Sequence, residues 1–368
     1  MFLNVRIILV LFLAYLNISW AHPGHDHQVE AAERSEYLKH NTRSLSHCTA
    51  RLRSRGHEAA NLKRRQHLAH ELRRTRGLDD HPFLKARDLN SVLSQSHRSN
   101  DTSIALDTPL QTIFSDNSSC ILQPEVTEGP YYVSGELIRK NITNGEEGVP
   151  LALDMQIIDV TTCEPVDGVY VDIWHCNATG VYGGVIAAGN GASSDTNNVN
   201  NTAFRGLQKT DGLGVVQFDT IFPGHYAGRA NHIHLLTLVE DATRLLNNNT
   251  VSGLTASHSG QMFFDQSLQA EVETIQPYTA NTQDLTTNAQ DAILATEANS
   301  SDPMMEYVYL GERVTDGILG WIRIGINASE SHQVRAWGQY SPFDTDTQGV
   351  APAVSSSGAT RRGVLAIR

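Results

Sequence analysis

From about Cys120 onwards, the chain consists of short runs of β-forming residues, each followed by a cluster of turn-forming residues. The runs include LALDMQIIDV, GVYVDIWHC, GVVQFDTIF, HIHLLTLV, QMFFD and GWIRIGI, and the clusters include Glu-Gly-Pro, Thr-Asp-Gly-Leu-Gly and Phe-Pro-Gly-His. Many short strands without alternating long helices are typical of an all-β sandwich or barrel. We therefore expect residues 100–330 to form a mainly β domain, a sandwich or a barrel with long loops and few short helices.

The chain divides sharply by charge. Of its 368 residues, positions 28–99 hold 15 lysines and arginines against 8 acidic residues, and positions 100–368 hold 12 against 31. The basic part has few large apolar residues, so it cannot form a core of its own. We expect residues 22–99 to be a charged helical or disordered arm. It is either a propeptide cleaved at the basic clusters 63–65 or 73–74, a segment lying on the acidic body, or a solvated helix and linker.

The first residues have the pattern of a secretory signal peptide. Arg6 precedes an apolar stretch over residues 7–16, and Ala21 gives a small residue at the expected cleavage point. No later segment is apolar enough to span a membrane. We therefore expect residues 1–21 to be removed and the protein to be secreted, where nucleic-acid binding by the basic arm is not expected. Beyond residue 21, eight matches to the N-glycosylation pattern agree with this location, at Asn100, Asn117, Asn141, Asn177, Asn200, Asn248, Asn299 and Asn327.

The cysteine content and the C-terminal segment add two smaller expectations. Four cysteines are too few for a scaffold built on disulfides, and they allow one or two bridges with no preferred pairing. Because no CxxC motif occurs, a cysteine-based zinc site is not expected. Residues 331–368 are poor in large apolar side chains, so we expect a flexible tail. The cysteines are Cys48, Cys120, Cys163 and Cys176.

The segment FPGHYAGRANHIHLLTL, residues 222–238, combines unusual side chains in one short stretch. His232 and His234 are two residues apart in a β-like run, so both project from the same face of the strand. Burying two imidazoles on one face is costly unless something binds them. Taken alone, the pair is also explained by one exposed histidine and one that is hydrogen-bonded inside the protein.

Two tyrosines make the pattern more specific. Tyr182 and Tyr226 complete the spacing Tyr-x(43)-Tyr-x(5)-His-x-His, and Arg229 stands three residues before the first histidine. With this pattern the chain resembles the intradiol ring-cleavage dioxygenases, and is most like their secreted fungal branch. The resemblance extends, in the family's order, through TEGPYY (127–132), VDIWHCNATGVYGG (171–184), FRGLQKTDGLGVVQFDTIFPGHYAGRANHIHL (204–235) and GQMFFD (260–265).

The resemblance implies a non-haem ferric iron site in a β-sandwich of the intradiol dioxygenase type. Phenolate oxygens suit a hard, highly charged cation, because a bound cation favours the deprotonated tyrosine. Imidazoles add neutral donors. The implied substrates are a catechol and O2, and the ring opens between its two hydroxyl-bearing carbons to give a muconate-type diacid. The implied metal ligands are Tyr182, Tyr226, His232 and His234.

The resemblance also implies roles around the metal. Tyr226 gives way to the catechol and takes up one of its protons, and Arg229 stabilises the negative charge that develops on the ring. Gln261 lies near the same site, and Tyr131 contacts the substrate at the mouth of the pocket. Each has a simpler interpretation: Arg229 as an ordinary ion pair with an acidic residue, Gln261 as a polar strand residue, and Tyr131 as an anchor of its loop.

Two other hypotheses remain open. The first is a catalytically idle β-sandwich that binds phenolics or metal. The intact set of ligands and Arg229 favours the enzyme, because a site that no longer catalyses a reaction can lose its ligands. The second is a copper or zinc site at the mature N-terminus HPGHDHQ, which begins with His22. There, three histidines stand close to a free α-amine, although Pro23 removes a backbone donor.

Overall fold

The computed structural model describes residues 45–79, 120–122, 129, 131–187, 189–191, 194–298 and 302–340. The expected signal peptide, the histidine-rich leader and the sequons at Asn100, Asn117 and Asn299 lie outside these residues. Among the helices that the structure describes, none has the length and hydropathy needed to cross a membrane.

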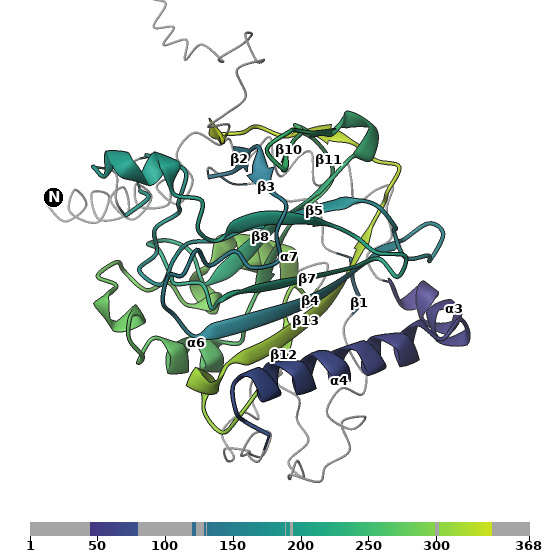
Figure 1. The fold of residues 1–368 in the computed structure, drawn as a ribbon, viewed down its shortest axis with the longest axis horizontal. Coiled ribbons are helices and arrows are strands. Elements are labelled where there is room, and N and C mark those ends of the chain that lie inside the picture. The colour runs from purple at the N-terminus through teal and green to yellow at the C-terminus, as the bar shows by residue number, and fades with distance from the viewer. Residues whose placement is uncertain are drawn as a thin grey trace, which may run out of the picture.

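Two five-stranded sheets form the body of the molecule (Figure 1). The first sheet has the order β1-β13-β4-β7, with β12 paired to β13, and the second has the order β14-β11-β8-β5-β6. The first sheet comprises β1 (Cys120–Leu122), β4 (Pro150–Asp159), β7 (Val215–Ile221), β12 (Glu306–Tyr309) and β13 (Ile318–Ile326). The second comprises β5 (Tyr170–Trp174), β6 (Arg205–Lys209), β8 (His232–Leu238), β11 (Thr255–Phe263) and β14 (His332–Gln333).

Shorter elements complete the described fold. Two small sheets have the orders β3-β10-β9 and β15-β2. Their strands are β2 (Val133–Ser134), β3 (Glu136–Leu137), β9 (Arg244–Leu245), β10 (Thr250–Ser252) and β15 (Gly338–Gln339). The α-helices are α3 (Thr49–Ser54), α4 (His57–Thr75), α6 (Gln266–Val272) and α7 (Ala292–Ala298). The 3-10 helices are η1 (Leu45–Cys48), η2 (Thr196–Asn200), η3 (Glu240–Ala242), η4 (Tyr278–Ala280), η5 (Asn288–Gln290) and η6 (Val314–Asp316).

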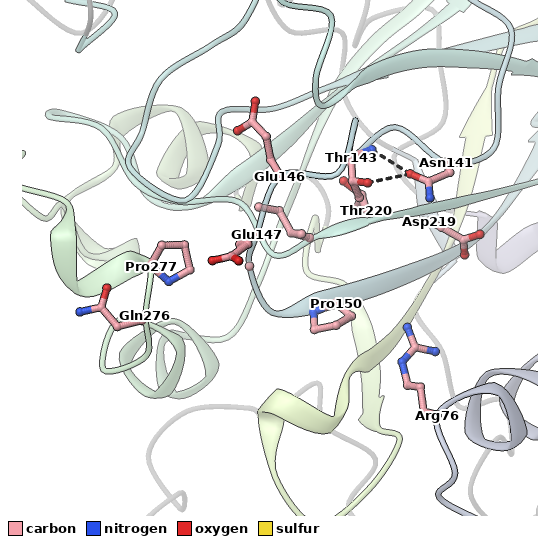
Figure 2. A pocket seen from close by; sticks show the side chains of 12 residues that line it. Arg76, Asn141, Thr143, Glu146, Glu147, Pro150, Asp219, Thr220, Gln276 and Pro277 are labelled. Carbon is pink, nitrogen blue, oxygen red and sulfur yellow. Dashed lines mark hydrogen bonds between the residues drawn. The ribbon is translucent and has the colours of Figure 1, made fainter.

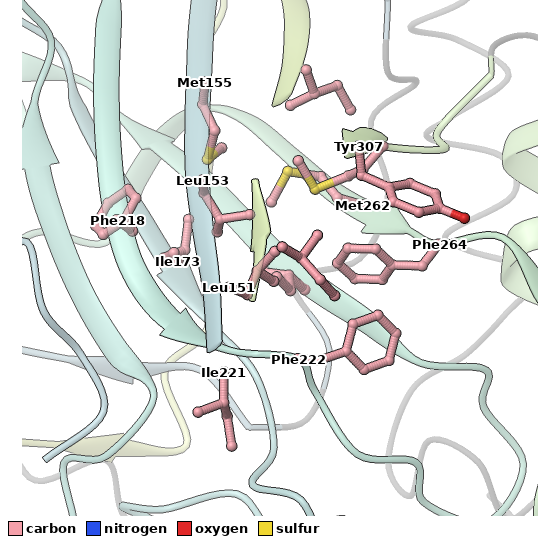
Figure 3. Packing of buried hydrophobic residues seen from close by; sticks show 14 of the residues in the cluster. Leu151, Leu153, Met155, Ile173, Phe218, Ile221, Phe222, Met262, Phe264 and Tyr307 are labelled. Atoms are coloured by element: carbon pink, nitrogen blue, oxygen red, sulfur yellow. The ribbon is translucent and has the colours of Figure 1, made fainter. Parts of the chain in front are cut away.

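The two large sheets pack face to face around one apolar core. Leu151, Leu153 and Met155 of β4 alternate along the strand and meet Ile173 and Met262 of the second sheet (Figure 3). Alternate residues of a strand point to opposite faces, so this pattern commits one face of each sheet to the core. The predicted mainly β sandwich with few helices is therefore confirmed.

Helix α4 covers the other face of the first sheet (Figure 1). Its Arg64 makes two hydrogen bonds of 2.8 and 2.7 Å to Asp154, a fully buried carboxylate on β4. Next to it, Arg65 is buried and lies over the ring of Trp321. A disulfide joins Cys48 to the body at residue 163. The described part of the basic arm therefore packs against the sandwich; whether the arm is cleaved stays a prediction.

The structure differs from the expected flexible tail at residues 332–340. Here β14 pairs with β11 and β15 pairs with β2. The backbone N–H of Trp337 donates to the carbonyl of Tyr132 at 2.8 Å, and that of Tyr340 donates to the carbonyl of Ser134 at 2.7 Å. The segment is held by backbone pairing, which a search for large apolar side chains does not detect.

Candidate metal centre

Strand β8 carries the two histidines on the face of the second sheet that is turned away from the core. Ile233 and Leu235 belong to the central core, whereas His232 and His234 lie among the buried residues of the opposite face. The alternation along HIHLLTL thus places both imidazoles on one face, as the sequence predicted. Loops cover this face, so both histidines are buried although they do not belong to the central core.

The structure brings the four predicted ligands into one cluster. The Nε2 atoms of the two histidines are 3.0 Å apart. The hydroxyl of Tyr182 lies 3.5 Å from Nε2 of His232 and 3.1 Å from Nε2 of His234. The hydroxyl of Tyr226 lies 3.4 Å from Nε2 of His232. Two phenol oxygens and two imidazole nitrogens therefore converge on one buried point.

These separations fit a set of donors that share one cation. Donor atoms bonded to one ion at about 2.1 Å, with angles of about 90–110° between them, lie roughly 3.0–3.4 Å apart. The mixture of oxygen and nitrogen donors suits a hard, highly charged metal ion such as ferric iron.

Neighbouring groups fix the orientation of each imidazole. Nδ1 of His232 lies 2.6 Å from the carbonyl oxygen of Ala230. Because a carbonyl only accepts, Nδ1 carries the proton and the lone pair of Nε2 faces the cluster. The ring of His234 stacks on Trp174, with centroids 4.8 Å apart and planes 4° apart. The two residues are register partners on β8 and β5, which explains why they share a face.

Tyr182 is held by its backbone. Its N–H donates to Oδ1 of Asn190 at 2.7 Å, and its carbonyl accepts from Nδ2 of Asn190 at 2.9 Å and from Nδ2 of Asn198 at 2.7 Å. Both asparagines are buried. The two positions that clamp this tyrosine are therefore buried, although they lie in a stretch rich in Gly and Asn.

A tight turn links Tyr226 to Arg229. The N–H of Arg229 donates to the carbonyl of Tyr226 at 3.2 Å. Gly228 has a φ of +89°, a backbone conformation that residues other than glycine rarely adopt. The turn brings Arg229 back beside the tyrosine that precedes it by three residues, so one loop supplies both a phenol and a cation.

Arg229 is held from two sides inside the protein. Its Nε donates to Oδ2 of Asp291 at 2.9 Å, and one terminal nitrogen donates to Oε1 of Gln261 at 2.5 Å. Gln261 pairs with His234 in the register of β11 and β8. Burial lowers the pKa of Arg229, but Asp291 together with Tyr226 and Tyr182 outweighs burial, and the pKa lies above the ordinary value. Arg229 therefore forms the ion pair that the simpler interpretation expected, and it also lies beside the cluster.

Tyr131 lies against both tyrosines of the cluster. Its ring centroid is 4.8 Å from that of Tyr182 and 6.3 Å from that of Tyr226. Burial raises the pKa of Tyr131 to about 12, so its hydroxyl stays protonated. In the same loop Gly129 has a φ of +79°, and a β-carbon there would lie 2.9 Å from Cε1 of His234. This loop therefore contacts the cluster so closely that a larger residue does not fit.

The phenols of the cluster do not ionise on their own. Burial raises the pKa of Tyr182 well above its ordinary value, and the neighbouring Tyr226 raises it further. The pKa of Tyr226 is raised as well, again chiefly by burial, and Arg229 opposes part of the shift. A buried cation reverses this preference, because it stabilises the phenolate that burial disfavours.

All the predicted site residues thus meet in one place, and three further residues complete it. Asn190, Asn198 and Asp291 contact Tyr182 or Arg229 from distant parts of the chain. The Asn-rich stretch after Tyr182 was a usable signal, since asparagine readily bonds to backbone groups. Nothing in the sequence around Asp291 distinguishes it from the other acidic residues.

A separate cavity of about 490 Å³ lies between the start of β4 and the end of β7 (Figure 2). Glu146, Glu147 and Asp219 line it together with Arg76, and none of the predicted site residues does. The sequon residue Asn141 also lies at this cavity, where its Oδ1 accepts hydrogen bonds from Thr143 (Figure 2). The cavity is distinct from the cluster.

Comparisons with known proteins converge on one class. A family model described as "Dioxygenase" matches residues 127–245. Catechol 1,2-dioxygenase 1 from Acinetobacter lwoffii is 26% identical over 153 residues, which cover 35% of this chain and 46% of that protein. The chain therefore spans less than half the length of this relative.

Two solved structures are similar to part of this chain. An intradiol ring-cleavage dioxygenase from Tetranychus urticae is 28% identical, with a TM-score of 0.47, covering 57% of this chain and 97% of its own. A dioxygenase domain from Streptomyces sp. SirexAA-E, part of a fusion with a carbohydrate-binding protein, is 23% identical, with a TM-score of 0.36, covering 58% and 99%.

Proposed function

Because residues 127–245 belong to the intradiol ring-cleavage dioxygenase family, we propose that this protein is a secreted, non-haem Fe(III) dioxygenase of catechols. In the proposed reaction, the carbon–carbon bond between the two hydroxyl-bearing carbons breaks and both atoms of O2 enter the product. Catechol and O2 together then give a cis,cis-muconate-type diacid with no further reactant.

The observation that carries the proposal is the buried cluster of two phenols and two imidazoles with Arg229 beside it. Tyr182, Tyr226, His232 and His234 would hold the iron. Ferric iron held there would supply Lewis-acid chemistry that favours the deprotonated catechol and activates its ring towards O2.

The chain's own residues then have distinct tasks. Tyr226 would take up a proton from the incoming catechol hydroxyl, because a buried phenol that no longer contacts a cation is neutral. Arg229, fixed in place by Asp291 and Gln261, directs positive charge at the ring, where negative charge develops. Tyr131 offers its ring to the substrate and keeps its proton.

Secretion is supported by two observations. The disulfide between Cys48 and Cys163 suits an oxidising compartment. Of the described sequon residues, Asn141 and Asn200 are exposed, as glycan attachment requires, whereas Asn177, Asn248 and Asn327 are half-buried. The WHCNATGVY form of the Tyr182 loop supports a place in the secreted fungal branch.

The test is turnover of catechol by the iron-loaded protein under labelled O2. We expect the product to absorb as a muconate and to contain two labelled oxygen atoms by mass spectrometry. Tyr182→Phe and His232→Ala should abolish turnover. An iron-loaded protein that binds catechol without forming a product would support the idle phenolic-binding sandwich and contradict the enzyme.

A further inference from the structure

We propose that Asp291 is a positioning residue for catalysis, which fixes Arg229 beside the metal cluster. This inference rests on the proposed function and extends it to a part of the chain outside the matched segment 127–245. Asp291 stands immediately before α7, in the long connection between the second sheet and β12, where no sequence motif marks a functional residue.

The carboxylate of Asp291 is saturated with hydrogen bonds from two directions. Its Oδ2 accepts from Nε of Arg229 at 2.9 Å and from the N–H of Ala230 at 2.8 Å. Its Oδ1 accepts from the N–H groups of Ile293 at 2.8 Å and Leu294 at 3.0 Å. One oxygen is thus bound to the start of α7, and the other is aimed at the arginine loop.

Burial makes this pair a strong constraint. Asp291 is 0% exposed and Arg229 is 1% exposed. A buried guanidinium without an anion would be costly, so the pair fixes where Arg229 can lie. The hydrogen bond to Gln261 fixes the other end of the guanidinium, and Gln261 is the register partner of His234. The plane of Arg229 is therefore defined relative to a predicted metal ligand.

Orientation matters because Arg229 acts as a preorganised charge. A donor that is aimed at developing charge before reaction costs no reorganisation, and losing one such donor typically slows turnover strongly. Without Asp291, the guanidinium would keep its charge but lose its direction. The proposed role is therefore positioning: Asp291 acts through Arg229 and does not itself touch the substrate.

The experiment is a double-mutant cycle with Asp291→Asn and Arg229→Gln, measured on the iron-loaded protein. Asp291→Asn should lower kcat by roughly 10–100-fold with little change in KM, as for other partners of site residues. Because both changes remove one function, the double variant should be no slower than Arg229→Gln alone. Additive losses would overturn the proposal, because they would mean that Asp291 acts apart from Arg229.

A readout without iron separates this proposal from the proposed function. In the iron-free protein, the Nε–H of Arg229, identified by its loss in Arg229→Gln, should give a 15N NMR signal protected from exchange. Asp291→Asn should remove that protection. Asp265→Asn is the matched control, because Asp265 is also buried at the start of a helix, α6. An unchanged signal in Asp291→Asn would overturn the proposal even if the wild-type protein cleaves no catechol.

If Asp291→Asn does not fold, the same measurements can be made on Asp291→Glu. It keeps the charge but moves it by one methylene group, so we expect a shifted Nε–H signal and a reduced kcat. A glutamate variant with wild-type kcat and an unshifted signal would contradict positioning by Asp291.

Discussion

At the scale of single residues, the candidate site depends on side chains that are not themselves among the four proposed metal ligands. Asn190 is one of them, because it accepts from the N–H of Tyr182 and donates to its carbonyl. The tyrosine ring therefore projects from a backbone that is fixed by two hydrogen bonds. The same asparagine also donates to the carbonyl of Val185, which ties the following turn to the clamp.

Asn190→Ala should weaken both folding and metal binding. It leaves the buried N–H of Tyr182 without its partner, whereas the carbonyls of Tyr182 and Val185 keep their hydrogen bonds from Asn198. An unpaired buried N–H costs about 1–3 kcal/mol in the free energy of unfolding. Iron affinity, measured by competition with a chelator, should fall roughly 10–100-fold, because the tyrosine loses its orientation. Asn197→Ala, at an exposed position in the same loop, is the control. Equal iron affinity in the two variants would contradict the clamp.

Gly129→Ala tests how closely the Tyr131 loop approaches His234. The new β-carbon would lie 2.9 Å from Cε1 of that imidazole. Gly145→Ala is a matched control, because Gly145 has a φ of +82° against +79° for Gly129 but has no atom within 4 Å of the added carbon. Both variants carry a similar backbone strain, of about 1–2 kcal/mol. Only Gly129→Ala should lower the iron content, measured per purified protein; equal iron contents would disprove the contact.

At the scale of elements, helix α4 is tied to the first sheet through Asp154. Burial raises the pKa of this carboxyl, but hydrogen bonds and charge from Arg64 and Arg65 outweigh burial, and the pKa lies below its ordinary value. An aspartate with a lowered folded-state pKa stabilises the fold above its unfolded-state pKa. That contribution is lost as the pH falls through the folded-state pKa.

Arg64→Ala should therefore destabilise the protein more at pH 7 than at pH 3. At pH 7 it leaves a buried carboxylate short of a partner, which costs about 3–5 kcal/mol in the free energy of unfolding. At pH 3, part of that difference should disappear. Denaturant unfolding at the two pH values gives the measurement, with the exposed Arg74→Ala on the same helix as control. A loss that does not depend on pH would argue against the ion pair.

The elements that carry the site could be predicted because their signals are local. The alternation of HIHLLTL fixes which residues of β8 share a face, and Pro223 with Gly224 marks the turn before Tyr226. The contacts that hold the site could not be predicted, because they are long-range. Asp291 is 62 positions from Arg229 in sequence, and Cys48 is 115 positions from its disulfide partner.

Helix α4 illustrates the same limit at the surface of the sandwich. Its sequence is basic and has no strong apolar stripe, so the sequence predicts a solvated arm. Its partners are Asp154 and Gln156, which stand among apolar residues of β4. The polar side chains of the helix and of the strand bind each other, and this is visible only once the two elements are packed together.

At the scale of the whole molecule, charge should influence substrate choice. The chain has a formal net charge of −12, and the cation beside the cluster, Arg229, is already paired with Asp291. Anionic substrates approach such a surface more slowly, and the effect is weakened by salt. We expect kcat/KM for catechol to exceed that for 3,4-dihydroxybenzoate by about tenfold or more at low ionic strength. Added salt should narrow the ratio; a preference for the carboxylate would contradict this expectation.

The central claim, that the cluster on β8 and its loops binds ferric iron, is tested most directly by the visible spectrum of the purified protein. Tyrosinate bound to ferric iron should give a burgundy charge-transfer band with about one iron per chain, and anaerobic catechol should shift the band to longer wavelength. Tyr182→Phe should weaken or abolish the band. A wild-type protein that stays colourless and free of iron after ferric reconstitution would contradict the account.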